Sequence, residues 1–193
     1  MRSVGPILLR LALLFTSLAA THVAAAPAPS WTVDRAASAI RFTSSLNGQG
    51  FSGAFRRWDT AIRFDPANLA GSSVTASIDV ASAATGDADR DQALPTPTFF
   101  SAAKFPRAIF TANSFRSLGA NHYQAVGQLS LRGVSKPLTL PFTLAITGSK
   151  ANMTASLAFN RLAFGVGQDE WQKTDVLPAN VTLSIAIAAT RAK

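Results

Sequence analysis

From Trp31 onward, the chain is built from short runs in which apolar and polar side chains alternate. The plainest run covers residues 74–80, where apolar side chains alternate with Thr75, Ser77 and Asp79. Because successive side chains of a strand point to opposite faces, such alternation predicts a half-buried strand. Comparable runs are found at 38–42, 51–55, 62–64, 108–112, 123–131, 138–146, 154–159 and 181–187.

Turn residues separate these runs at intervals of roughly 8–15 residues. Examples are Asn47-Gly48, Asp65-Pro66 and the stretch 119–121. Neither a strand–helix–strand rhythm nor a repeat of 20–50 residues is visible in the sequence. The pattern therefore predicts an all-β domain of about eight or nine antiparallel strands, arranged as a barrel or a sandwich.

The strand pattern is interrupted once, near residues 85–104. Residues 85–91 carry the Asp and Thr side chains that favour a helix start. The following residues 94–100 contain Pro95 and Pro97, which exclude a regular helix. We predict a short helix followed by an irregular segment, and the double aromatic Phe99-Phe100 suits a lid over the mouth of a barrel.

Several positions expected to face the interior carry small side chains. A barrel of about eight strands either fills its interior with side chains or holds one small ligand. Small inward residues leave space, and this favours a cavity. The candidates are Ser38, Gly53, Ala76, Ala108, Ala125 and Gly127.

Residues 1–26 have the features of a cleaved signal peptide. Arg2 supplies a positive start, residues 11–20 are mostly apolar, and residues 24–26 are three alanines. The apolar stretch is shorter than the ~20 residues that a membrane-spanning helix needs. We therefore expect export to the periplasm without stable membrane insertion, a short linker at 27–30, and one domain at 31–193.

Charge and composition exclude several kinds of chemistry. The formal net charge is +8, but the basic residues are scattered along the chain, so no nucleic-acid site is expected. The chain has no cysteine, and after removal of His22 with the signal peptide only His122 remains. We expect no metal site, no cofactor and no enzymatic activity. The acidic trio Asp87, Asp89 and Asp91 lacks the rest of a calcium loop and is better explained as a helix start.

Several short motifs cover almost the whole domain. They read Trp31-Thr32-Val33-Asp34, Ser38-x-Ile40-x-Phe42, Gly53-x-Phe55, Phe64-Asp65-Pro66, Ile78-Asp79-Val80, Arg90-Asp91-x-x-Leu94, Phe99-Phe100, Phe105-Pro106-x-Ala108-x-Phe110, Gly127-x-Leu129-x-Leu131-Arg132-Gly133-Val134-Ser135-Lys136-Pro137 and Asn160-Arg161-x-x-Phe164-Gly165-Val166-Gly167. In their order and spacing, these motifs resemble the YceI-like family of bacterial, lipocalin-like isoprenoid-binding proteins. The chain departs from the family where Ala37 and Ala93 replace frequent histidines and Ser101 replaces a frequent acidic residue.

The resemblance implies a lipocalin-like antiparallel barrel with an apolar tunnel that binds a long isoprenoid or acyl lipid, often as a homodimer. The aromatic side chains expected to contact the lipid tail are Phe42, Phe55, Trp58, Phe99, Phe100, Phe105, Phe110, Phe142, Phe164 and Trp171. Arg90, with Lys104 or Arg161, is a hypothesis for contact with a polar head group. Pairing of Arg90 with Asp87 or Asp91 is an equal alternative. The rival function is a stress-related interaction protein whose barrel is filled by its own side chains.

Overall fold

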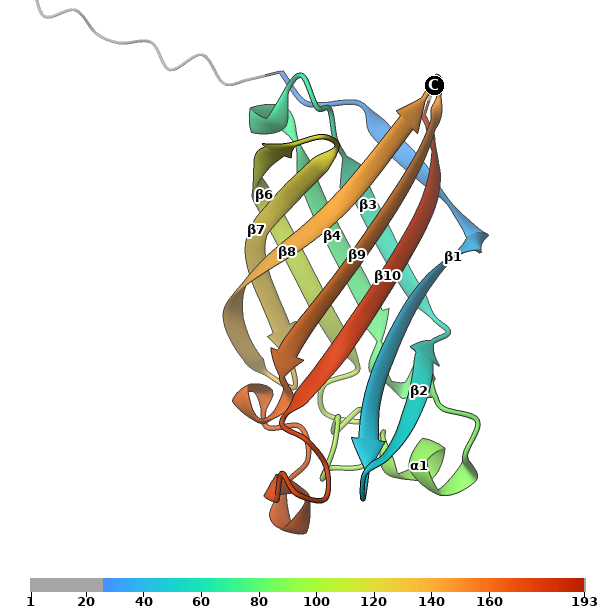
Figure 1. Ribbon diagram of the computed structural model, residues 1–193, viewed down its shortest axis with the longest axis vertical. Helices are drawn as coiled ribbons and strands as arrows, with labels where there is room; N and C mark the ends of the chain where they lie inside the picture. Colours follow the sequence, from blue (N-terminus) through green and yellow to red (C-terminus); the bar gives the residue numbers. More distant parts are fainter. Residues whose placement is uncertain (1–25, 193) are drawn as a thin grey trace, which may run out of the picture.

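The computed structural model describes residues 26–192, which form a barrel of tilted antiparallel strands (Figure 1). The expected signal peptide at 1–26 lies outside the described residues except for Ala26. The strands are β1 (Ser30–Leu46), β2 (Gln49–Phe55), β3 (Trp58–Arg63), β4 (Ser73–Asp79), β5 (Ala83–Ala84), β6 (Arg107–Gly119), β7 (His122–Leu131), β8 (Val134–Thr147), β9 (Lys150–Asn160) and β10 (Asn180–Arg191). The helices are α1 (Ala88–Ala93) and the 3-10 helices η1 (Leu69–Gly71), η2 (Val80–Ser82), η3 (Arg161–Phe164) and η4 (Asp169–Gln172).

The barrel closes because β1 pairs with β10 as well as with β2 and β3. On its other side, β1 pairs with β3 near its start and with β2 near its end. In the next position of the wall, β4 pairs with β3 and β5 pairs with β2. β2 and β3 together therefore occupy one position in the wall, as do β4 and β5, and eight strand positions surround the axis. The prediction of an all-β, lipocalin-like barrel of about eight strands is confirmed.

The two ends of the barrel differ. One end is covered by residues 85–106, which include α1, and by residues 161–178, which include η3 and η4 (Figure 1). We call these two stretches the lid segments and this end the lid end. The predicted short helix and irregular segment near 85–104 are confirmed as α1 and the non-helical residues that follow it. The opposite end carries η1 and the described chain termini (Figure 1).

Residues 26–30 contact the barrel at this opposite end. Ala28 is only 2% exposed, and its N–H donates to the carbonyl oxygen of Gly71 at 2.9 Å. The Nδ2 atom of Asn68 donates to the carbonyl oxygen of Ala26 at 2.8 Å. Residues 27–30 were expected to be a linker, and the structure places them against η1 and the start of β1.

An aromatic cluster lies inside the barrel near the opposite end. The ring of Phe64 lies 5.3 Å from Phe115, 5.4 Å from Tyr123 and 5.7 Å from Phe142, in each case edge to face. Aromatic pairs in this geometry contribute about 0.5–1.5 kcal/mol beyond the area that they bury. The Nε1–H of Trp31 donates to the carbonyl oxygen of Phe64 at 2.9 Å, which satisfies the polar atom of a buried ring. The cluster makes this end of the barrel firmly packed.

Close packing of backbone predicts the effect of a side chain at Gly127. Gly127 of β7 pairs with Ala112 of β6 next to an irregularity in the register. A Cβ atom there would lie 2.1 Å from the carbonyl oxygen of Thr111. We expect Gly127→Ala to lower the free energy of unfolding by about 1–3 kcal/mol, measured by urea denaturation. Gly50→Ala is the control, because no atom lies within 4 Å of a Cβ at Gly50, and a loss as large as that of Gly127→Ala would contradict the explanation.

Candidate functional site

A cavity of about 270 Å³ occupies the interior of the barrel. Side chains from β1–β4 and β6–β10 line it, and so do residues of both lid segments. The lining runs from Trp31 and Ala189 at the opposite end to Phe99 and Leu177 at the lid end. Nearly all of this surface is apolar, so the cavity offers a ligand hydrophobic contact along its full length.

The small inward residues explain only part of this space. Ala76, Ala108 and Ala125 line the cavity as expected. Gly53 instead makes room for the Phe42 ring, since a Cβ at Gly53 would lie 2.3 Å from its Cζ atom. The Oγ atom of Ser38 accepts from the backbone N–H of Ala188 at 2.9 Å, so this side chain serves the β1–β10 seam. Small residues on strands thus have three different uses here.

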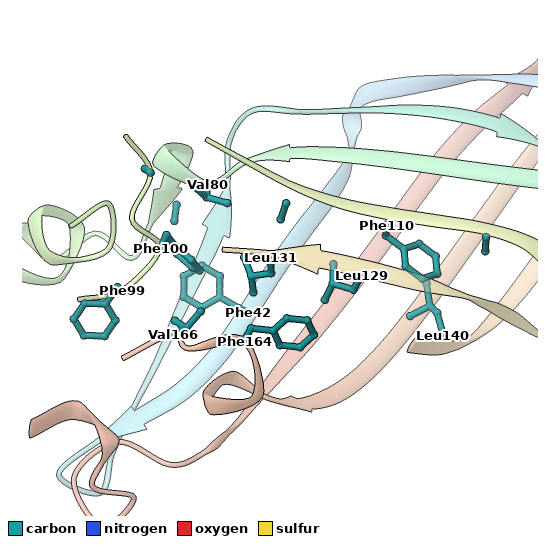
Figure 2. Close-up of a cluster of buried hydrophobic side chains, with 14 of the residues drawn as sticks. Phe42, Val80, Phe99, Phe100, Phe110, Leu129, Leu131, Leu140, Phe164 and Val166 are labelled. Carbon is teal, nitrogen blue, oxygen red and sulfur yellow. The ribbon is translucent and has the colours of Figure 1, made fainter. Parts of the chain in front are cut away.

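Six of the predicted aromatic residues line the cavity: Phe42, Phe55, Phe99, Phe100, Phe110 and Phe142. Figure 2 shows Phe42 and Phe100 close to the lid segments and Phe110 farther along the barrel axis. Phe55 joins two of these rings, lying 5.3 Å from Phe42 and 6.0 Å from Phe100. The structure therefore brings these side chains together from distant parts of the sequence.

The other four predicted aromatics lie outside the lining. Phe164 packs behind Phe159 with ring centroids 5.9 Å apart, and Trp171 packs behind Phe99 at 5.5 Å. The guanidinium of Arg35 covers the buried ring of Trp58 at 4.0 Å. Phe105 lies under the β7–β8 turn, where its ring approaches Gly133. These residues support the wall of the cavity from behind. Phe105, Phe164 and Trp171 lie outside the strands, where alternation gives no guidance, whereas Trp58 begins β3.

The three predicted basic residues have different positions. Arg161 lines the cavity, whereas Arg90 and Lys104 do not. The guanidinium of Arg90 lies 4.9 Å from the ring centroid of Phe51 and 3.4 Å from the Asp87 carboxylate, as the pairing alternative expected. Lys104 is exposed, with its Nζ 5.3 Å from the Phe105 ring centroid. Arg161 is thus the basic residue of the three that a ligand in the cavity can approach.

Arg161 is 2% exposed and is held by backbone carbonyl oxygens. Its Nε donates to Pro178, its Nη1 to Val166, and its Nη2 to both Trp171 and Leu177, at distances of 2.6–2.9 Å. Burial lowers the pKa of the guanidinium, which starts high enough for the charge to remain at neutral pH. Four carbonyl dipoles compensate this charge, so Arg161 fixes the shape of the second lid segment.

Arg132 connects the two lid segments, a role that sequence reasoning did not identify. From the turn between β7 and β8, its Nη1 donates to Gly165 at 2.6 Å and its Nη2 donates to Pro97. The N–H groups of Gly167 and Gln168 both donate to the carbonyl oxygen of Thr98 at 3.0 Å. The lid segments are therefore joined to each other over the end of the barrel.

Aliphatic side chains form the largest part of the lining, and sequence analysis left them out of the candidate site. Their alternation along β7, β8, β9 and β10 was the available signal, but the same alternation describes an ordinary core. The lining aliphatic residues of these strands include Leu129, Leu131, Leu138, Leu140, Leu157 and Leu183.

Side chains at the start of α1 organise the loop that follows β5. The Asp91 carboxylate accepts from the N–H of Thr85 at 2.6 Å, from its hydroxyl at 2.7 Å and from the N–H of Gly86 at 3.3 Å. The backbone hydrogen bond from Thr85 is the main cause that lowers the pKa of Asp91. The Asp87 side chain caps α1 by accepting from the N–H of Arg90. These carboxylates organise the loop, as the helix-start interpretation expected.

The lowered pKa of Asp91 predicts a loop that loosens in acid. A carboxyl group whose pKa is lower in the folded protein contributes stability above its unfolded pKa of about 3.9, and this contribution is lost as the pH falls through the folded pKa. We expect protection of the Thr85 and Gly86 amides from hydrogen exchange, corrected for intrinsic rates, to decline below about pH 4. Asp91→Asn should remove this dependence and Asp89→Asn, an exposed control, should keep it. Equal pH profiles in wild type and Asp91→Asn would contradict the assignment.

A closed antiparallel barrel around an apolar cavity defines this protein as lipocalin-like. The chain belongs to the YceI-like domain family, whose model matches residues 31–189. It is 30% identical to a UPF0312 protein of Yersinia enterocolitica, with 94% of each chain covered.

Solved structures share the fold. BcnA of Burkholderia cenocepacia superposes with a TM-score of 0.79 at 31% identity, covering 82% of this chain and all of that one. A polyisoprenoid binding domain from Saccharophagus degradans superposes with a TM-score of 0.67 at 15% identity, covering 85% of this chain and 99% of that one. At that identity the second likeness shows the fold alone.

Within residues 26–192, no group of three or more His, Asp or Glu side chains is placed to hold a metal ion. None of the helices in this range is long and apolar enough to cross a membrane.

Proposed function

We propose that the barrel binds one long apolar lipid in its cavity: a polyisoprenoid, an isoprenoid quinone or a fatty-acid derivative. The observation that carries the proposal is the cavity itself, which is apolar along the whole barrel. Transfer of apolar surface out of water contributes roughly 25 cal/mol per Å². A long hydrocarbon chain can bury most of its surface in such a space, whereas a compact polar metabolite would lose its hydrogen bonds to water.

We propose binding without catalysis, and the chemistry of the lining supports this. Among the described residues, those that line the cavity include no carboxylate and no histidine. His122 is exposed on β7, where its Nδ1 contacts the carbonyl oxygen of Ala120 at 2.8 Å. General acid–base catalysis needs such a group within hydrogen-bonding reach of the reacting atoms.

We propose further that the protein carries or stores its lipid in the periplasm. The signal-peptide pattern of residues 1–26 supports this location, and a lidded barrel suits a lipid that must cross an aqueous compartment. The polyisoprenoid binding domain from Saccharophagus degradans has the same fold, so the fold is compatible with this ligand class. A homodimer remains a prediction. The rival interaction protein with a self-filled barrel is disfavoured by the cavity.

Binding is tested by titrating the purified protein with a 15- or 20-carbon isoprenoid alcohol and following tryptophan emission. Trp31 lines the cavity, so its emission should change and saturate at one lipid per chain. A ligand at one hundred times its Kd should also stabilise the fold by about 2.7 kcal/mol. Trp31→Phe is the control that assigns the signal. An unchanged spectrum together with an unchanged unfolding transition would contradict the proposal.

A further inference from the structure

One polar atom in the cavity wall has no hydrogen-bond partner. Within residues 26–192, the structure leaves two buried side-chain polar atoms unpaired, Ser44 Oγ and Arg132 Nε. Arg132 belongs to the contact between the lid segments and does not line the cavity, whereas Ser44 does. Ser44 follows Ile40 and Phe42 in the row of β1 side chains that face the interior. It therefore places a hydroxyl group where strand alternation calls for an apolar side chain.

An unpaired hydroxyl in such a wall is unfavourable for the protein alone. Most buried polar side-chain atoms in folded proteins have a partner, and each exception calls for an explanation. A hydroxyl group can donate one hydrogen bond and accept up to two. A ligand that brings an oxygen atom to this position would satisfy Ser44 and would be distinguished from a pure hydrocarbon.

Ser44 lies toward the lid end of the cavity. Strands β1 and β9 lie on either side of β10 (Figure 1). Thr43 of β1 pairs with Thr182, and Asn160 of β9 pairs with Asn180, both near the start of β10. Ser44 and Arg161, the next residues along the chain, therefore both lie near the lid end. Arg161 uses four hydrogen bonds for its carbonyl contacts, although a guanidinium has five N–H groups. Arg63 and Ser73 line the cavity at its opposite end, so the orientation proposed below rests on the unpaired Oγ of Ser44.

We propose that the ligand carries a hydrogen-bonding oxygen on one terminus and that Ser44 binds this oxygen at the lid end, with the hydrocarbon tail directed toward Trp31. The inference rests on the proposed lipid-binding function and adds an orientation and a specificity residue to it. The oxygen can belong to an alcohol, a carbonyl or an acid, since each of them pairs with a hydroxyl group.

The experiment compares a 15-carbon isoprenoid alcohol with the hydrocarbon in which hydrogen replaces its hydroxyl group. Both compete for a fluorescent lipid probe bound to the wild type and to Ser44→Ala. Desolvation of the ligand hydroxyl is the same for both proteins, so the ratio of the two Kd values isolates the contact with residue 44. We expect Ser44→Ala to shift this ratio about tenfold against the alcohol, since one buried hydrogen bond is lost.

Two variants control this comparison. Ser44→Thr keeps a hydroxyl group and should keep the wild-type ratio within about twofold. Ser52→Ala removes an exposed hydroxyl from the neighbouring strand β2 and should leave the ratio unchanged. The unliganded Ser44→Ala protein should be at least as stable as wild type, because it loses an unpaired group. If the hydroxyl group had a structural role, Ser44→Ala would lower the free energy of unfolding.

The outcomes separate this inference from the function on which it rests. A Kd ratio that is the same in wild type and Ser44→Ala overturns the assignment of Ser44, while lipid binding stands. Displacement of the probe by neither compound contradicts the proposed function itself. Orientation is read from acyl chains brominated at the far end, which should quench Trp31 more strongly than chains brominated beside the head group; the reverse order overturns the orientation.

Discussion

Replacement of Arg161 by Met is expected to cost about 3–5 kcal/mol of folding free energy. The change leaves four backbone carbonyl oxygens, of Val166, Trp171, Leu177 and Pro178, without the donor that now pairs with them. Each buried acceptor left unsatisfied costs about 1–3 kcal/mol, and local rearrangement with entry of water recovers part of the sum. Urea denaturation with linear extrapolation measures the loss.

Two further variants sharpen this test. Arg161→Lys keeps the charge but offers three donors without the planar fork, so its loss should lie between those of wild type and Arg161→Met. Arg107→Met removes an exposed arginine from β6 and should change the free energy of unfolding by no more than about 0.5 kcal/mol. A loss below 1 kcal/mol for Arg161→Met would contradict the account of the second lid segment.

Filling the cavity from its wall should abolish binding without unfolding the barrel. Ala76 of β4 lines the cavity and pairs with Thr60 of β3 and Phe110 of β6 in the sheet. We expect Ala76→Phe to raise the Kd for a 15-carbon isoprenoid alcohol at least about 100-fold, because the ring occupies the space of the hydrocarbon chain. The free energy of unfolding should change by less than about 3 kcal/mol, since the new ring enters empty space.

The neighbouring residue provides a matched control. Thr75 precedes Ala76 on β4 and points to the exposed face of the barrel wall. Thr75→Phe adds a ring of the same size outside the cavity and should leave the Kd within about twofold of wild type. Wild-type affinity in a folded Ala76→Phe protein would mean that the lipid does not occupy this cavity.

The fold was accessible from the sequence because its strands alternate plainly. The run at 74–80 lies in β4 up to Asp79, with Val74, Ala76 and Ile78 in the cavity lining, whereas Val80 begins η2. Helix α1 ends before the prolines at 95 and 97, as expected. Closure into a barrel was not visible in the alternation itself. It depends on pairing between β1 and β10, whose partners are about 150 residues apart, as in Ala39 with Ala186.

The candidate site was accessible only in part, for physical reasons. Aromatic residues on strands could be assigned a side by parity, so Phe42 and Phe110 were found. Parity has no meaning in the irregular lid segments, so Phe105 and Trp171 were included although they lie behind the lining. Arg90 and Arg161 look alike as sequence features. Arg90 lies in a polar helix start, whereas Arg161 follows β9 at the lid end of the barrel and is buried.

The polar exceptions show what sequence alternation conceals. Ser44 continues a strand of apolar and hydroxyl residues, and composition gives no reason to separate it from Ser45 or Ser52. Only the three-dimensional structure shows that its oxygen lies in the cavity wall without a partner. Arg132 likewise reads as a turn residue, and its link between the lid segments depends on contacts with Pro97 and Gly165, more than thirty residues away on either side.

Native mass spectrometry of the protein purified from its own cells tests the central claim most directly, with organic extraction of whatever is released. The account predicts a complex of one chain with one apolar lipid, and an extracted isoprenoid or acyl compound that bears an oxygen at one end. A ligand-free mass that stays unchanged after incubation with isoprenoid alcohols, isoprenoid quinones and fatty acids would contradict it, and would favour a barrel that acts through its outer surface.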